Sequence, residues 1–134
     1  MSVIKIRAAL ETAVAAMSPA LATAWENAAF APPVASTPYQ QVFILWAEPE
    51  NVEFGAGHRQ RGILQITLRY PVSAGTGTVA TRAELIRTTF YRGASFTYSG
   101  TTVVIDRTPE VVQGATDGDR FVVVVRVRFF ANIM

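Results

Sequence analysis

A glycine-rich turn is the first place in this sequence where residue types and spacing could bind a ligand. Gly75-Thr76-Gly77-Thr78-Val79-Ala80 fits the pattern G-x-G-x-x-A between a predicted strand and a predicted helix. A dinucleotide pyrophosphate binds in that local context. The full pattern also needs a parallel βαβ unit with an acidic residue about 20 residues further on. Here a predicted hairpin follows the helix and Asp106 comes 26 residues after Ala80, so a tight turn that begins a helix is favoured.

The acidic residues offer two further candidates. Asp117-Gly118-Asp119 could supply half of a cation site, because hard cations bind several carboxylate oxygens, but Asp-Gly between two strands is more typical of a turn. Glu48, Glu50 and Glu53 could act as a general acid and base, although nothing in the sequence buries them to shift a pKa. We therefore expect a solvated loop and no metal.

Composition excludes several kinds of catalytic site. The 134 residues contain no cysteine and a single histidine, His58, which excludes thiol nucleophiles and any metal site that needs two imidazoles. The serines are scattered along the chain. We expect no catalytic residue and no cofactor, and a small ligand-binding or hydrolytic enzyme is kept only as a rival interpretation.

The charge is nearly balanced and widely spread. Twelve basic residues, eleven of them arginine, face ten acidic ones and leave a net charge of +2. A nucleic-acid-binding module usually concentrates its basic residues in one stripe, whereas these arginines run from Arg7 to Arg128 with acids between them. Half of the residues are hydrophobic, so we expect one folded domain over residues 1–134 with apolar surface left for a partner.

Two amphipathic helices are predicted. The first covers residues 2–17, with one apolar stripe formed by Val3, Ile6, Leu10, Val14 and Met17. Glu11 within this segment and Pro19 after it argue against a signal peptide, and no stretch reaches the roughly 20 apolar residues of a membrane span. The second covers residues 78–91, with Thr78 as its N-cap and Gly93 as a left-handed stop.

The other predicted elements are strands. They cover residues 39–47, 62–70, 94–98, 101–106, 109–112 and 120–131. Two-residue alternation is clearest in the second and the last of them, and Ser99-Gly100 joins two strands in a hairpin. The expected fold class is α+β, a largely antiparallel β-sheet packed against the N-terminal helix and the mid-chain helix 78–91, both on one side.

Two regions are candidate contact surfaces. Residues 49–61 form a predicted long loop that contains His58, Arg59 and Arg61, and loops of this length in a small domain are often functional. Arg126 and Arg128 interrupt the second face of the last strand, which suits partial cover by another subunit. These five residues are the candidate interface residues.

The order of the residues along the chain is recognisable as a whole. The succession is Arg61-Gly62-Ile63-Leu64-Gln65-Ile66-Thr67-Leu68, Tyr70-Pro71, Gly75-Thr76-Gly77, Ala83 to Phe90, and a hairpin through Val104 and Ile105 to Pro109. It resembles the tail terminator, or tail-completion, proteins of long-tailed bacteriophages, including a phage domain family formerly of unknown function. The resemblance covers residues 39–131, and the N-terminal helix is also in the expected place.

The resemblance implies a structural virion protein of the tail or neck, assembled in the host cytoplasm, and no enzyme. Such a protein forms a homo-oligomer, a hexameric ring, on the finished tail tube, stops tube growth and presents a surface for head-tail joining. Its partners would be the tail tube protein and the head-tail connector, with DNA only passing through the ring lumen and no membrane. Residues 49–61 would contact a neighbour or the tube, and Arg126 and Arg128 a subunit boundary or the lumen.

The rival interpretation from another class is a small nucleic-acid-binding or nucleotide-binding module. Phosphate contacts release counterions, so the affinity of such a module for DNA falls steeply as the salt concentration rises. We predict no binding to double-stranded DNA when it is measured at two salt concentrations. Tight binding at the lower concentration that is lost at the higher one would support the rival.

Overall fold

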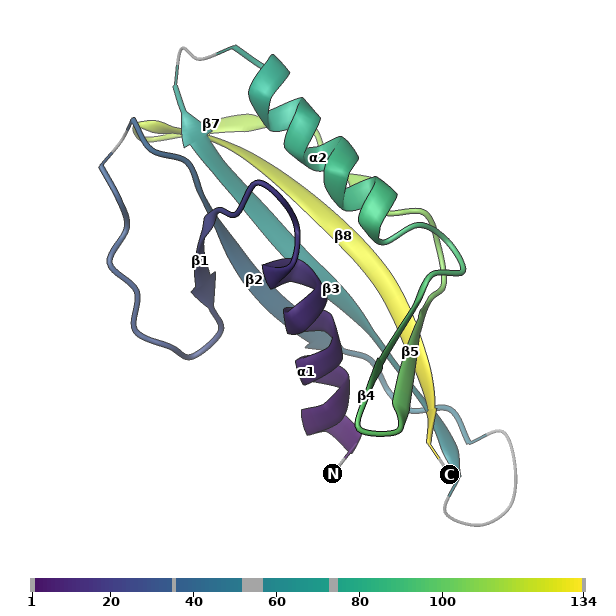
Figure 1. Cartoon of the computed structure of the whole chain (residues 1–134). Coiled ribbons are helices and arrows are strands. Elements are labelled where there is room, and N and C mark those ends of the chain that lie inside the picture. Colours follow the sequence, from purple (N-terminus) through teal and green to yellow (C-terminus); the bar gives the residue numbers. More distant parts are fainter. Residues whose placement is uncertain (1, 35, 52–56, 73–74, 134) are drawn as a thin grey trace.

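Both helices lie on the same face of one curled β-sheet (Figure 1). The computed structural model describes residues 2–34, 36–51, 57–72 and 75–133. Within them the sheet has 8 strands in the order β1-β2-β3-β8-β5-β4, with β6 and β7 also paired to β8. In the part of the chain described, no helix is long and apolar enough to span a membrane.

The centre of the sheet is one long antiparallel pair. Strand β3 (His58–Pro71) pairs with β8 (Arg120–Ile133) in unbroken register from His58↔Ile133 to Pro71↔Arg120. Because side chains alternate along a strand, an unbroken register gives the pair two distinct faces. The helix face carries buried residues: Leu64, Ile66, Leu68, Val123, Val125, Val127 and Phe129. The other face, called the open face below, carries the intervening residues.

Strand β2 (Tyr39–Trp46), a predicted strand, pairs antiparallel with β3, and β1 (Ala22–Trp25) lies at the edge beside it. The pairing of β1 with β2 is parallel, so the sheet is mixed and the prediction of a largely antiparallel sheet is only partly right. No periodicity marks this four-residue strand. It is held by tertiary contacts, and just beyond it the carboxylate of Glu26 accepts a hydrogen bond from the Ile44 N–H at 3.1 Å.

The second half of the chain folds by local pairing. Strands β4 (Ser95–Tyr98) and β5 (Thr101–Ile105) form the predicted hairpin, and Ser99 and Gly100 both have positive φ at its turn, as a type I′ turn requires. Two short strands, β6 (Glu110–Val111) and β7 (Ala115–Asp117), pair with β8. The Asp117-Gly118-Asp119 segment is the tight turn from β7 into β8, with Gly118 at φ 63°.

Helix α1 (Ser2–Ala15) uses the predicted stripe. Ile6, Leu10, Val14 and, just beyond the helix, Met17 are buried in the core, whereas Val3 is 39% exposed because it lies near the free end of the helix. The helix packs against β4 and β5. The hairpin and the N-terminal helix therefore complete one core with the central strands.

Helix α2 (Gly77–Thr89) begins earlier and ends earlier than predicted. Thr76 holds the N-cap position without a side-chain hydrogen bond, so Thr78 is not the N-cap. Phe90 is the C-cap, and Gly93, at φ 90°, lies in the following turn, so it is not the helix stop. The end of the helix is set by packing. The buried Phe90 ring fixes the backbone at this point, although helix propensity alone would allow another turn.

The predicted loop over residues 49–61 is wrong at its C-terminal end. His58, Arg59, Gln60 and Arg61 belong to β3, and Glu50 forms a two-bond bridge with Arg59. This polar stretch is a strand because the last residues of β8 pair with it, and that pairing is invisible in the local pattern. Residues 52–56, including Glu53, lie outside the described residues.

Gly62 gives a direct test of the packing at this end of the central pair. A Cβ at Gly62 would lie 2.8 Å from Cζ of Phe129 and 2.9 Å from the Leu45 carbonyl oxygen. We predict that Gly62→Ala lowers the free energy of unfolding by about 1–3 kcal/mol, because the core is overpacked. Urea unfolding measures the change.

Gly77→Ala is the matched control, because nothing lies within 4 Å of a Cβ at this helical position. It should stabilise the protein by up to about 1 kcal/mol. Equal stability of the two variants would show that Phe129 does not pack against Gly62 as described.

Candidate interaction surfaces

The open face of the sheet has mixed apolar and basic character. Register places Leu45, Ile63 and Arg128 in one row across β2, β3 and β8. Phe43, Gln65 and Arg126 form the next row. Leu45 is 49% exposed and the other five are partly exposed. Helices cover only the opposite face (Figure 1), so these side chains form a surface that another chain can bury.

Four of the five candidate interface residues meet on this face. By strand alternation Arg59 and Arg61 of β3 share it with Arg126 and Arg128 of β8, and Arg61 is directly opposite Phe130. His58 falls on the other face, opposite Ile133. The structure thus joins the two candidate regions, which are about 65 residues apart in sequence, and leaves His58 out of the arginine cluster.

Each of these arginines has a local partner. Arg128 pairs with Glu110 at 3.3 Å and Arg61 with Glu50 at 3.8 Å, while Arg126 donates to the Gln65 side chain at 3.4 Å. The long distances and the exposure of these side chains indicate weak interactions, since exposed ion pairs contribute about 0–1 kcal/mol. The guanidinium groups can therefore exchange these partners for groups on another chain at little cost.

Arg59 is held more firmly than the others. Its Nε donates to the Asn132 side chain at 3.0 Å, and its guanidinium lies 4.7 Å from the centre of the Phe130 ring. A cation over an aromatic face contributes about 0.5–1 kcal/mol at an exposed site. Arg59 and Phe130 therefore form a flat, pre-organised element at one end of the open face.

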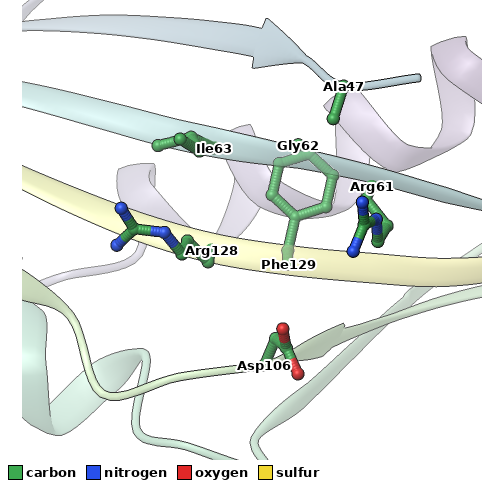
Figure 2. Close-up of a pocket in the computed structure, with 7 residues that line it drawn as sticks. All are labelled: Ala47, Arg61, Gly62, Ile63, Asp106, Arg128 and Phe129. Atoms are coloured by element: carbon green, nitrogen blue, oxygen red, sulfur yellow. The ribbon is translucent and has the colours of Figure 1, made fainter. Parts of the chain in front are cut away.

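A hollow of about 200 Å³ lies beside this cluster. Figure 2 shows Arg61 and Arg128 on either side of Phe129, with the Asp106 carboxylate pointing toward β8. A second hollow, of about 370 Å³, is lined by Arg92, Asp106, Arg107 and Thr108. Asp106 is shared by both and is exposed. These are charged, water-accessible hollows suited to contacts with a charged surface.

The glycine-rich turn and the Asp117-Gly118-Asp119 segment, which the sequence offered as possible ligand sites, have structural roles. Gly75 adopts φ 76° in the turn before α2, as a tight turn requires. Asp117 pairs with Arg69 at 3.0 Å and sits in the β7–β8 turn. Among the described residues there is no group of three or more His, Asp or Glu side chains that could hold a metal ion.

Arg120 is an important residue that the sequence pattern does not single out. It is 5% exposed and donates to the backbone carbonyls of Pro33 (2.8 Å), Val34 (2.9 Å) and Thr37. Its guanidinium lies 4.8 Å from the centre of the Tyr39 ring. One arginine at the start of β8 thus fixes the segment between β1 and β2, and this segment limits the open face at that end.

The chain is similar to known proteins in both sequence and fold. The sequence matches the phage tail terminator protein family over residues 5–129. No curated protein matches the chain. Three chains of solved structures match it. One of them, a protein whose name states no function, has a TM-score of 0.81 at 24% sequence identity, and the match covers 100% of this chain and 98% of that one.

The arginines of the open face and Arg120 should differ in their contribution to stability. We predict that Arg126→Gln and Arg128→Gln change the free energy of unfolding by less than about 0.5 kcal/mol, because their partners are solvated. Arg120→Gln should lower it by about 3 kcal/mol, because buried hydrogen bonds to a charged group are lost. Urea unfolding of the three variants measures these changes, and a large loss in Arg126→Gln or Arg128→Gln would show that the open face is needed for folding.

Proposed function

Because the chain belongs to the phage tail terminator protein family, we propose that six copies form a ring that caps the tail tube, ends tube polymerisation and provides the surface for joining the head. The family implies a structural role in the phage tail. Capping, termination and joining are all binding events. The protein binds other copies of itself and the neighbouring virion proteins, and it carries out no reaction.

The observation that supports ring formation best is the open face. A closed ring uses head-to-tail contacts, so each subunit needs two different complementary patches. The open face, with Leu45, Phe43 and Ile63 between arginines, supplies one patch of the kind found in subunit contacts, where apolar and arginine side chains are enriched.

The second patch is best supplied by the start of α1 together with the tip of the β4–β5 hairpin. Ile4 is 66% exposed near the start of α1, and Tyr98 is 47% exposed at the tip of the β4–β5 hairpin. Helix α1 packs against this hairpin, and the start of α1 lies near its tip (Figure 1). An aromatic and an aliphatic side chain on adjacent elements can pack against the apolar rows of a neighbour's open face.

The charges fit a position in the neck of the virion. Arginines that are not used between subunits can face the lumen, where DNA passes, or meet acidic groups on the tube or connector, since exposed ion pairs exchange partners readily. We place the ring between the tube protein and the connector, in the tail or neck of a virion assembled in the host cytoplasm.

Ring formation should depend on the open face. We predict that the mass measured by light scattering rises toward that of a hexamer as the protein concentration increases. Leu45→Asp should raise the concentration needed by at least tenfold, because it places a charge in the apolar part of the contact. Ala80→Asp, an exposed change near the start of α2, is the matched control and should leave association unchanged.

The same variants are then added to purified tail tubes, and the wild-type protein should bind tube ends and stop further growth. Only monomer at every concentration, together with no binding to tube ends, would contradict the proposed function.

A further inference from the structure

A cavity of about 440 Å³ lies where the segment after α1 meets α2, apart from the open face. Its walls are apolar, with Leu21, Leu85 and the buried Tyr70 among them. Ser18 and Thr81, both exposed, contribute hydroxyl groups at its rim. A volume of this size is in the range that accommodates a ligand or one or two side chains of another protein.

An arginine is buried in the wall of this cavity. Arg82 is 4% exposed and sits on the buried stripe of α2, between Val79 and Ile86. Its Nη1 donates to the carbonyl oxygen of Pro19, but Nε and Nη2 are shielded from solvent and have no hydrogen-bond partner among the described residues. Burial lowers the pKa of Arg82, and the nearby Tyr70 partly opposes that shift.

The two unpartnered nitrogens define the chemistry that would complete the site. Nε–H and Nη2–H lie on the same side of a guanidinium and form the fork that binds both oxygens of a carboxylate. A buried charge without such a partner is costly, whereas one that is paired and fully hydrogen-bonded is tolerated. The cavity that Arg82 lines is apolar, so it favours a ligand that combines a carboxylate with an apolar group once the fork, which is shielded in this conformation, turns toward it.

We propose that the cavity between α1 and α2 is a docking site for a segment of a partner protein in which an acidic side chain lies next to an apolar one. The carboxylate pairs with Nε and Nη2 of Arg82 after the guanidinium turns into the cavity, and the apolar side chain packs against Leu21 and Leu85. The hydroxyls at the rim favour a peptide over a fatty acid, because they can bond a peptide backbone. The Ser18 hydroxyl can donate or accept, whereas the Thr81 hydroxyl already donates to the Gly77 carbonyl and can only accept.

The identity of the partner as a virion protein rests on the proposed function, whereas the carboxylate chemistry does not. The site is also separate from the ring contacts proposed above. One subunit can therefore bind its neighbours through the open face and a different protein through this cavity.

The chemistry is tested with octanoate, a carboxylate on an apolar chain, and with octanol as its uncharged match. Octanoate titrated into the ¹⁵N-labelled protein should shift the Nε–H signal of Arg82 saturably and give contacts to Leu21 and Leu85. Arg82→Met should weaken octanoate binding at least tenfold, and Arg7→Met, a change at a partly exposed arginine of α1 that pairs with Glu11 and Glu26, should not. No saturable shift at Arg82, or equal binding by Arg82→Met and the wild type, would overturn the proposal.

The partner is tested with tail tubes and heads. If the cavity holds a partner segment, Arg82→Met should still form rings but lose at least tenfold in affinity for either the tube or the head, and octanoate should compete with that binding in the wild type. Octanoate binding with tube and head binding unchanged in Arg82→Met would overturn the partner assignment. Octanoate binding by a protein that neither forms rings nor binds tubes would refute the proposed function and leave the carboxylate site standing.

Discussion

The pairing of β3 with β8 is the interaction on which the rest of the structure depends. Its unbroken register over 14 residues of each strand sorts every side chain to one of two faces. One face is apolar and collects both helices, which forms the core. The other receives the arginines at positions 59, 61, 126 and 128. A slip of β8 by one residue would bury Arg126 and Arg128 and expose Val123, Val125 and Val127, so the same register specifies both the stability and the candidate contact surface.

The parts of the fold with strong local periodicity could be predicted from the sequence. Leu64, Ile66 and Leu68 alternate with polar residues, and Ile6, Leu10 and Val14 repeat at helical spacing, so the two helices and the central strands were expected in the right places. Strand β1 and the first four residues of β3 were missed because distant partners specify them. His58 to Arg61 is a strand only because residues 130–133 lie beside it.

The sequence suggested members of the candidate site but not their arrangement. Arg59, Arg61, Arg126 and Arg128 stay predicted contact residues, and only the register showed that they share one face, which His58 does not. Arg82 and Arg120 escaped notice because an arginine is usually solvated. At both positions the partners are far away in sequence: Pro19 for Arg82, and Pro33, Val34 and Thr37 for Arg120.

We propose that the open face is covered by a neighbouring subunit at the end of a tail tube. Electron cryo-microscopy of purified tubes mixed with the protein measures this arrangement directly. We expect a closed ring at one end of the tube, with Leu45, Ile63 and Arg128 of each subunit buried against the next. Subunits that bind the tube singly, or a ring in which this face of the sheet points into solvent, would contradict it.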